Sequence, residues 1–331
     1  MNYVEMDNEQ RRQLIDVQQA YATWRPADLA LKDIGSMHWQ RTKGVRYLIE
    51  KHGAVRKSLG RETPAFAKKK QDFDSRKKAL KARAAASGSR LKRMADVNKA
   101  LRLGRLRKIV ADIVRELDSR GLLGTHVIVV GTNALHAYEA AYGVLIGSDH
   151  VATTDADLLW DARKSLQLVS KNIGADGLMG ILRSVDPSFT ADYGFNATND
   201  DGYIVDLLTP EFAKRVPLLE DLTGSGLEAT AMPGMISLLE APQLEEVVIA
   251  EDGWPVRTVV PEARTFALHK LWVSKQPSRK PVSRRKDADH AALLADLIAT
   301  HSNDRFVAKD MPWLPKELRG LLKELKPSKR K

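Results

Sequence analysis

Two aspartates lie two positions apart in an otherwise apolar run. The run is TTDADLLWD, residues 153–161, and it contains Asp155 and Asp157. Side chains alternate between the faces of a strand, so both carboxylates would project from one face while Ala156 and Leu158 project from the other. An unpaired buried carboxylate costs several kcal/mol, so it must be paired or bind a metal ion. The spacing therefore predicts paired ligands for a hard cation such as Mg²⁺.

A third acidic residue interrupts another apolar strand. In DDGYIVDLLTP, residues 200–210, Asp201-Gly202 is a hairpin signal and YIVDLL is a predicted strand that contains Asp206. If this strand lies beside the first, Asp206 completes a set of three carboxylates, enough for the two ions of phosphoryl or nucleotidyl transfer. The alternative is a charge at the edge of a sheet.

A glycine turn precedes these strands. In THVIVVGTNALHAYEAAYG, residues 125–143, the β-branched run Thr125–Val130 predicts a strand covered on both faces, and Gly131-Thr132 leads into a helix that runs to about Tyr142. The free N–H groups and the dipole of a helix start favour an anion. Gly131 and Thr132 are therefore candidate phosphate ligands, with a simple helix cap as the alternative.

Composition narrows the cofactor and the location. The absence of cysteine excludes disulfides, thiolate nucleophiles and Cys-ligated metal sites, and the eight histidines show no HExxH-type spacing. The expected cofactor is therefore Mg²⁺ or Mn²⁺, held by oxygen ligands. No apolar run approaches the roughly 20 residues of a membrane span, and the first residues lack the layout of a signal peptide. We expect a cytoplasmic protein with no membrane partner.

Positive charge is concentrated in the N-terminal third. Residues 1–120 contain 29 Lys and Arg against 14 Asp and Glu, while the rest of the chain contains 24 against 28. This asymmetry predicts an anionic partner, nucleic acid in particular, and RNA more than DNA. Solvated helix faces are the alternative explanation.

The elements of this basic region follow from its periodicity and turns. A short helix is predicted over 8–22, and glycine turns at Lys43-Gly44 and His52-Gly53 predict a three-stranded meander over about 35–60. Residues 64–93 predict an exposed helix, or a helix pair that breaks at 87–89, and a further helix is expected from Asp96 to Gly121. Aromatic and basic residues of the meander would contact nucleic acid or pack as a structural flap.

Three motifs together resemble the polymerase-β-like nucleotidyltransferase superfamily. VVGTNAL, TTDADLL and YIVDLL follow its order of a glycine with a small hydroxylated residue at a helix start, then [DE]x[DE], then a further acidic strand residue. The chain is similar to an uncharacterised bacterial group of nucleotidyltransferase-like proteins, also through GSMHWQRTKGVRYL and KSLG. EDGWPVRTVVPEARTFALHKLWVS, residues 251–274, is similar to the hairpin and helix of the abortive-infection and toxin–antitoxin branch. The resemblance covers most of residues 35–295.

The resemblance implies a role for each matching residue. Gly131 and Thr132 would hold the phosphates of an NTP, Asp155 and Asp157 would bind both metals, and Asp206 would complete the catalytic metal site. Two departures stand out: Thr132 replaces the more usual Ser, and the insert AYGVLIGSDHVATT separates the glycine turn from the carboxylates. The insert leaves the choice of nucleotide open.

Two lysines further along are candidate phosphate ligands. Lys270, in ALHKL, matches a basic residue that contacts nucleotide phosphates in related transferases, although it would also fit as a surface lysine. Lys286, in SRRKDADH, is expected near a helix start, where Asp287 would act as a cap. His269 is interpreted as a packing neighbour, and Asp161 is left out of the site.

The sequence thus predicts an α/β (α+β) fold with a mixed sheet of the polymerase-β type. We expect a basic module over 1–121, a catalytic core over 122–215 and a hairpin and helical region over 216–331 that ends in a short amphipathic helix and a basic tail. The expected reaction is Mg²⁺-dependent transfer of an NMP from an NTP to a hydroxyl of RNA, such as tRNA, of a protein or of a small molecule. The resemblance admits a toxin or phage-defence role with a cognate antitoxin. The alternatives are a nucleic-acid-binding protein with a degenerate transferase fold, and a kinase that transfers the γ-phosphate.

Overall fold

The computed structural model describes residues 2–53, 55–161, 163, 177–192, 196–211 and 229–325, and these form two compact units. The first comprises Met1–Arg11, Gly104–Glu251 and Val256–Lys331, and the second comprises Arg12–Leu103 and Asp252–Pro255. The division predicted from the sequence, 1–121, 122–215 and 216–331, stays a prediction, and its second boundary lies outside the described residues. So does the basic tail at 326–331.

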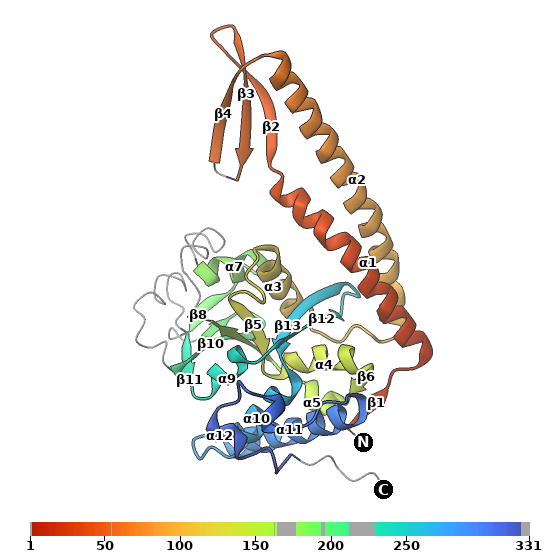
Figure 1. The fold of residues 1–331 in the computed structure, drawn as a ribbon, viewed down its shortest axis with the longest axis vertical. Coiled ribbons are helices and arrows are strands. Elements are labelled where there is room, and N and C mark those ends of the chain that lie inside the picture. The colour runs from red at the N-terminus through yellow and green to blue at the C-terminus, as the bar shows by residue number, and fades with distance from the viewer. Residues whose placement is uncertain are drawn as a thin grey trace. The chain divides into compact units, whose positions relative to one another are not determined.

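The first unit is built around a mixed six-stranded sheet in the order β5-β7-β10-β9-β8, with β11 also paired to β10 (Figure 1). Its strands are β5 (Val127–Val130), β7 (Asp155–Trp160), β8 (Thr190–Asp192), β9 (Asn196–Thr198), β10 (Ile204–Pro210) and β11 (Thr230–Met232). β7 and β10 run parallel, whereas β5 and β9 are antiparallel to their neighbours. The mixed α/β fold predicted from the sequence is confirmed.

Two small sheets and several helices complete this unit. The sheets pair β1 (Tyr3–Glu5) with β6 (Val144–Ile146), and β12 (Gln243–Ile249) with β13 (Pro255–Pro261). The helices are α3 (Lys108–Ser119), α4 (Leu135–Tyr142), α5 (Ser148–Val151), α7 (Gly177–Val185), α9 (Met235–Glu240), α10 (Ala263–Ser274), α11 (Pro281–His301) and α12 (Lys316–Arg319), with 3-10 turns η1 (Thr132–Ala134) and η4 (Ala308–Asp310). None of the described helices is long and apolar enough to cross a bilayer.

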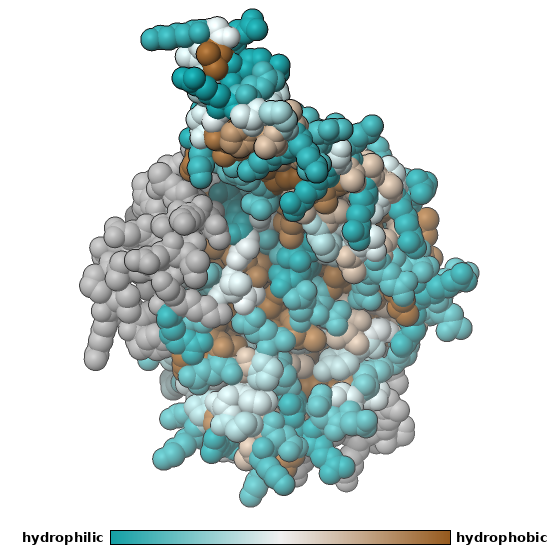
Figure 2. All heavy atoms as spheres, turned by 45° about the horizontal axis from the view of Figure 1, so that its top comes forward, coloured by the Kyte–Doolittle hydropathy of each residue, from teal (hydrophilic) through white to brown (hydrophobic). Residues whose placement is uncertain are grey.

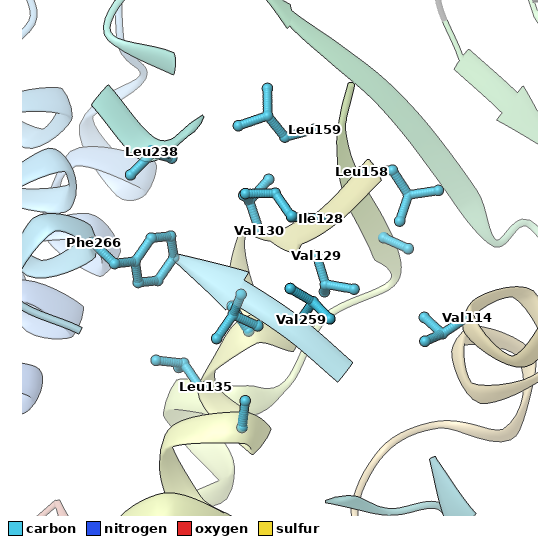
Figure 3. Close-up of a cluster of buried hydrophobic side chains, with 14 of the residues drawn as sticks. Val114, Ile128, Val129, Val130, Leu135, Leu158, Leu159, Leu238, Val259 and Phe266 are labelled. Carbon is cyan, nitrogen blue, oxygen red and sulfur yellow. The ribbon is translucent and has the colours of Figure 1, made fainter. Parts of the chain in front are cut away.

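The core of the first unit surrounds β5 and β7. Ile128 and Val130 of β5 and Leu158 and Leu159 of β7 are buried, and side chains from α3, α9 and α10 gather around them (Figure 3). Val114 of α3 belongs to this cluster, although the sequence placed its helix in the N-terminal module. The strands are therefore covered on both faces, as the continuous apolar run of β5 predicts.

The second unit contains most of α1 (Asn8–Asp33), the sheet β2 (Ser36–Thr42), β3 (Val45–His52) and β4 (Val55–Arg61), and α2 (Pro64–Ala100). The three strands form the antiparallel meander predicted from the two glycine turns.

Hydrophilic residues predominate over the described part of the face drawn in Figure 2, with apolar residues scattered among them.

Helix boundaries in this region differ from the predicted ones. The predicted break at 87–89 is wrong, because α2 continues through Gly88, where a Cβ would lie only 3.3 Å from Trp24 Nε1 of α1. The predicted continuous helix from Asp96 to Gly121 is also wrong. The chain leaves the helix after Ala100, and Arg105 N donates to Ile249 O at 3.0 Å before α3 begins.

The opening and closing helices also differ. The helix predicted over 8–22 extends to Asp33, through Pro26. The predicted C-terminal helix is reduced to the four residues of α12.

Candidate active site

The three predicted carboxylates lie on one face of the central sheet. Asp206 of β10 is paired in register with Asp157 of the adjacent parallel strand β7. Asp155 lies two residues before Asp157 and so shares its face. All three are half-buried. The structure therefore places on one face of the sheet, from two strands about 50 residues apart in sequence, the acidic side chains that the motifs singled out.

Gly131 is packed directly against this face. Val130 of β5 is the register partner of Asp157, and Gly131 follows it with φ +65° and ψ −151°. A Cβ at Gly131 would overlap Asp157 Oδ2 and lie 2.7 Å from its Cγ. Only glycine fits both the backbone conformation and the close approach.

Thr132 occupies a less open position than predicted. It begins the 3-10 turn η1, so the regular helix starts only at Leu135, and its side chain is buried. Gly131 lines the cavity described below, whereas Thr132 does not. The phosphate contact of Thr132 remains a prediction.

Burial and the charge of Asp155 disfavour the ionised forms of Asp157 and Asp206. Burial, followed by the charge of Asp155, raises the pKa of Asp157 to about 6; Lys270 and Arg279 oppose this shift and Asp206 adds to it. Burial and Asp155 also raise the pKa of Asp206. The face thus carries excess negative charge that a divalent cation would relieve.

The donor set fits such a cation by its chemistry. Carboxylate oxygens are the ligands that Mg²⁺ and Mn²⁺ prefer, and Asp155 is already fixed by accepting a hydrogen bond from the Thr153 hydroxyl. Within the described part of the chain, no three His, Asp or Glu side chains are clustered closely enough to hold a metal ion. The assignment of Asp155, Asp157 and Asp206 as metal ligands therefore remains a prediction. It requires the three carboxylates to move closer together when the metal ion binds.

A cavity of about 230 Å³ opens over Asp157 and Asp206. Gly131, directly after β5, lines one part of it. Lys270 of α10 and Arg279, from the segment between α10 and α11, line another part. The remaining wall is largely apolar and includes Val130, Leu238 and Phe266, from β5, α9 and α10 (Figure 3). The cavity thus combines two cations, two carboxylates and an apolar surface of the kind on which a nucleobase packs.

Asp287 holds the two cations of this cavity. Lys270 Nζ donates to Asp287 Oδ1 at 2.8 Å, and Arg279 Nε donates to Asp287 Oδ2 at 2.9 Å. Asp287 is 2% exposed and Lys270 is 9% exposed, so the alternative of a surface lysine is wrong. The predicted capping role of Asp287 is also wrong, because α11 begins at Pro281. Sequence reasoning missed both Arg279 and the bridging role of Asp287.

Lys286 lies in the second turn of α11 and faces a different space. Its Nζ donates to Ala152 O at 3.0 Å, and it lines a second cavity that also contains Asp155. Burial lowers the pKa of Lys286, and the charges of Asp155 and Asp157 oppose this shift while Lys270 adds to it. Lys286 therefore lies close to the carboxylates, though outside the first cavity.

His269 is a buried neighbour of Lys270. Burial and the charge of Lys270 lower its pKa to about 3, so the ring is neutral near pH 7. It packs against Trp272 with ring centroids 6.2 Å apart. This agrees with its interpretation as a packing neighbour.

Two residues that the sequence did not single out fix the backbone of Asp155. Asn133 Nδ2 donates to Asp155 O at 2.8 Å, and the Tyr203 hydroxyl donates to the same oxygen at 2.7 Å. Arg107 lies over the Tyr203 ring at 5.1 Å. Asn133 could have been singled out from the sequence, because it directly follows Gly131-Thr132. No sequence pattern marks Arg107.

The mixed sheet, the glycine turn and the acidic face together define a nucleotidyltransferase-type core. The family model described as nucleotidyltransferase matches residues 108–313, more than half of the chain. The chain belongs to this nucleotidyltransferase family. The match includes every predicted site residue but does not assign the abortive-infection and toxin–antitoxin branch. No match was found among the curated proteins or the solved structures.

Replacing Asp287 by asparagine should lower the free energy of unfolding by about 1–3 kcal/mol at pH 7. Burial alone would raise the pKa of Asp287, but Lys270 and Arg279 lower it overall, so its charge stabilises the fold. This contribution is present above the pKa of the unfolded carboxyl and is lost as the pH falls through the lowered folded pKa. Urea denaturation at pH 7 and at acid pH measures it.

Asp289→Asn, two residues along the same helix and exposed, is the matched control and should change little. Equal stability of the two variants at pH 7 would contradict a stabilising role for the bridge.

Proposed function

We propose that the protein catalyses divalent-metal-dependent transfer of a nucleoside monophosphate from an NTP to a hydroxyl, releasing pyrophosphate. Asp155, Asp157 and Asp206 would hold the metal, Mg²⁺ or Mn²⁺. When bound, it would promote loss of the attacking hydroxyl's proton and stabilise charge on the phosphoryl group. The acceptor oxygen forms a bond to the α-phosphorus, the bond to the bridging oxygen breaks, and its electron pair leaves with pyrophosphate.

The observation that carries this proposal is the register of β7 and β10, which puts Asp206 beside Asp157 on the face that Gly131 approaches. Lys270 and Arg279 lie in the same cavity, and their charges suit the β- and γ-phosphates. The apolar wall suits the base. Phosphoryl transfer needs mainly positioning of the reactants and stabilisation of charge, and the site offers groups for both.

We propose RNA, such as tRNA, as the acceptor. The second unit contains 23 Lys and Arg against nine Asp and Glu, a net charge of +14. On its sheet, Arg46 lies 5.0 Å over the Trp39 ring. Exposed basic residues on the same strands and turns are Arg41, Lys43, Lys51, Arg56, Lys57 and Arg61. Such a surface favours binding of a phosphate backbone without strong sequence preference.

Label transfer from each α-labelled NTP to total RNA or purified tRNA tests the function. We expect transfer in the presence of Mg²⁺ or Mn²⁺, none with EDTA, and loss of transfer in Asp155→Ala and Asp206→Ala. Asp201→Ala, at the exposed turn before β10, is the matched control and should retain activity. Tight, salt-sensitive RNA binding with no dependence of any activity on Asp206 would indicate a binding protein instead.

The same reactions with γ-labelled ATP separate nucleotidyl transfer from a kinase reaction, because only a kinase passes the γ-label to the acceptor. A toxin or phage-defence role with a cognate antitoxin extends the proposal, and it rests on the similarity of residues 251–274. Expression of the wild-type protein should then arrest growth, and expression of Asp206→Ala should not.

A further inference from the structure

A second cavity is lined by Asp155, at the start of the carboxylate row. It is open, has a volume of about 640 Å³, and is formed where the segment before α3, the region around α5, the start of β7 and α11 meet. Asp155 lines this cavity, whereas Asp157 and Asp206 line the first. The three carboxylates therefore border two different cavities.

The cations of the second cavity differ in how many of their donor groups already have a partner. Arg105 is largely engaged, since its Nε pairs with the buried Glu139 at 2.9 Å and its Nη2 donates to Ile146 O. Arg107 is exposed. Within the described residues it forms no ion pair, and its guanidinium lies over the face of the Tyr203 ring. Lys286 uses one donor on Ala152 O. Arg107 and Lys286 thus keep donors for an anion.

Neutral donors line the same space. Ser148, Thr153 and Thr154 contribute hydroxyls, although that of Thr153 donates to Asp155. A guanidinium, an ammonium and hydroxyl groups suit the several acceptor oxygens of a phosphate. The first cavity differs, because its cations are held by Asp287 and most of its wall is apolar.

We infer that the second cavity binds a phosphate group of the acceptor, held by Arg107 and Lys286. The inference rests on the proposed function and names the acceptor class as a hydroxyl compound that carries a phosphate. Because Asp155 lines this cavity, a hydroxyl next to the bound phosphate reaches the row of carboxylates. The NTP occupies the first cavity, where Lys270 and Arg279 lie.

Binding without NTP or metal tests the site directly. The probes are the dinucleoside monophosphate ApA, a phosphodiester, and ribose 5-phosphate, a phosphomonoester, each measured by calorimetry against adenosine and ribose, which lack phosphate. Arg107→Gln combined with Lys286→Gln should weaken binding of at least one phosphate probe by about tenfold or more. The probe that binds identifies an RNA-like or a small phosphorylated acceptor. Arg285→Gln, exposed on the same helix, is the control and should bind as wild type.

Equal binding of the probes to wild type and the double variant would overturn the inference, as would failure of the wild-type protein to bind either probe. A double variant that weakens ATP binding instead would assign the cavity to the NTP, which also overturns it. Failure of the proposed function would look different: the phosphate probes bind in the expected pattern, yet no label passes from any α-labelled NTP.

Discussion

Replacing Gly131 by alanine is expected to reduce nucleotidyl transfer at least about 100-fold and to lower the free energy of unfolding by roughly 2–5 kcal/mol. The backbone at Gly131 has φ +65° and ψ −151°, a region closed to alanine without strain. The added Cβ would also overlap Asp157 Oδ2, so the carboxylate must move. Urea denaturation and the label-transfer assay measure the two effects.

Gly202→Ala is the matched control for Gly131→Ala. Gly202 also has a positive φ, +74°, but a Cβ there would meet nothing within 4 Å. We expect a loss of about 1 kcal/mol and nearly full activity. Combining Gly131→Ala with Asp157→Ala removes the overlap and should recover part of the stability without recovering activity. Wild-type stability of the single Gly131→Ala variant would contradict the proposed packing.

The acidic face could be predicted because it depends on local rules. Strand alternation sets Asp155 and Asp157 on one side, and the turn at Asp201-Gly202 starts the strand that contains Asp206. The set of three carboxylates required the strand that contains Asp206 to lie beside the strand that contains Asp157, and the parallel pairing of β10 with β7 meets this condition. What the sequence could not provide is how close Gly131 lies to Asp157.

The ion bridge of the first cavity could not be predicted, because it depends on the packing of α10 against α11. Lys270 and Asp287 are 17 residues apart on different helices, and the short distance between them arises only when the helices meet. From sequence, a lysine on a helix is most simply exposed, and an aspartate near a helix start is most simply a cap. Tertiary packing overrides both defaults.

The same cause explains the error at Gly88. Serine and glycine in a helical pattern lower helix propensity, so a break at 87–89 is the local expectation. In the structure, the missing side chain lets Trp24 of α1 approach, and Ser87 Oγ donates to Arg83 O within the continuing helix. A contact 64 positions away in sequence decides the outcome, and no local pattern reports it.

Asp157→Asn is expected to abolish nucleotidyl transfer and yet to stabilise the metal-free protein at pH 8, by roughly 1–3 kcal/mol. The pKa of Asp157 is raised to about 6 in the folded protein, from 3.8. Between these values the folded state binds the proton and the unfolded state has released it, so stability is lost as the pH rises from about 4 to 6. Asparagine has no charge to bury and avoids this loss.

The pH and metal dependence separate this electrostatic cause from a packing change. Denaturation in EDTA should show the variant and the wild type converging near pH 4, with the variant more stable at pH 8. Added Mg²⁺ should raise the melting temperature of the wild-type protein and raise that of the variant much less, since ligand binding stabilises only the state that binds.

Asp201→Asn, exposed at the turn before β10, is the control for Asp157→Asn and should change neither the pH dependence nor the Mg²⁺ effect. If Asp157→Asn is less stable than the wild type at pH 8 without metal, the carboxylate stabilises the fold by itself. The excess of negative charge would then not be a reason to expect a divalent cation at this face.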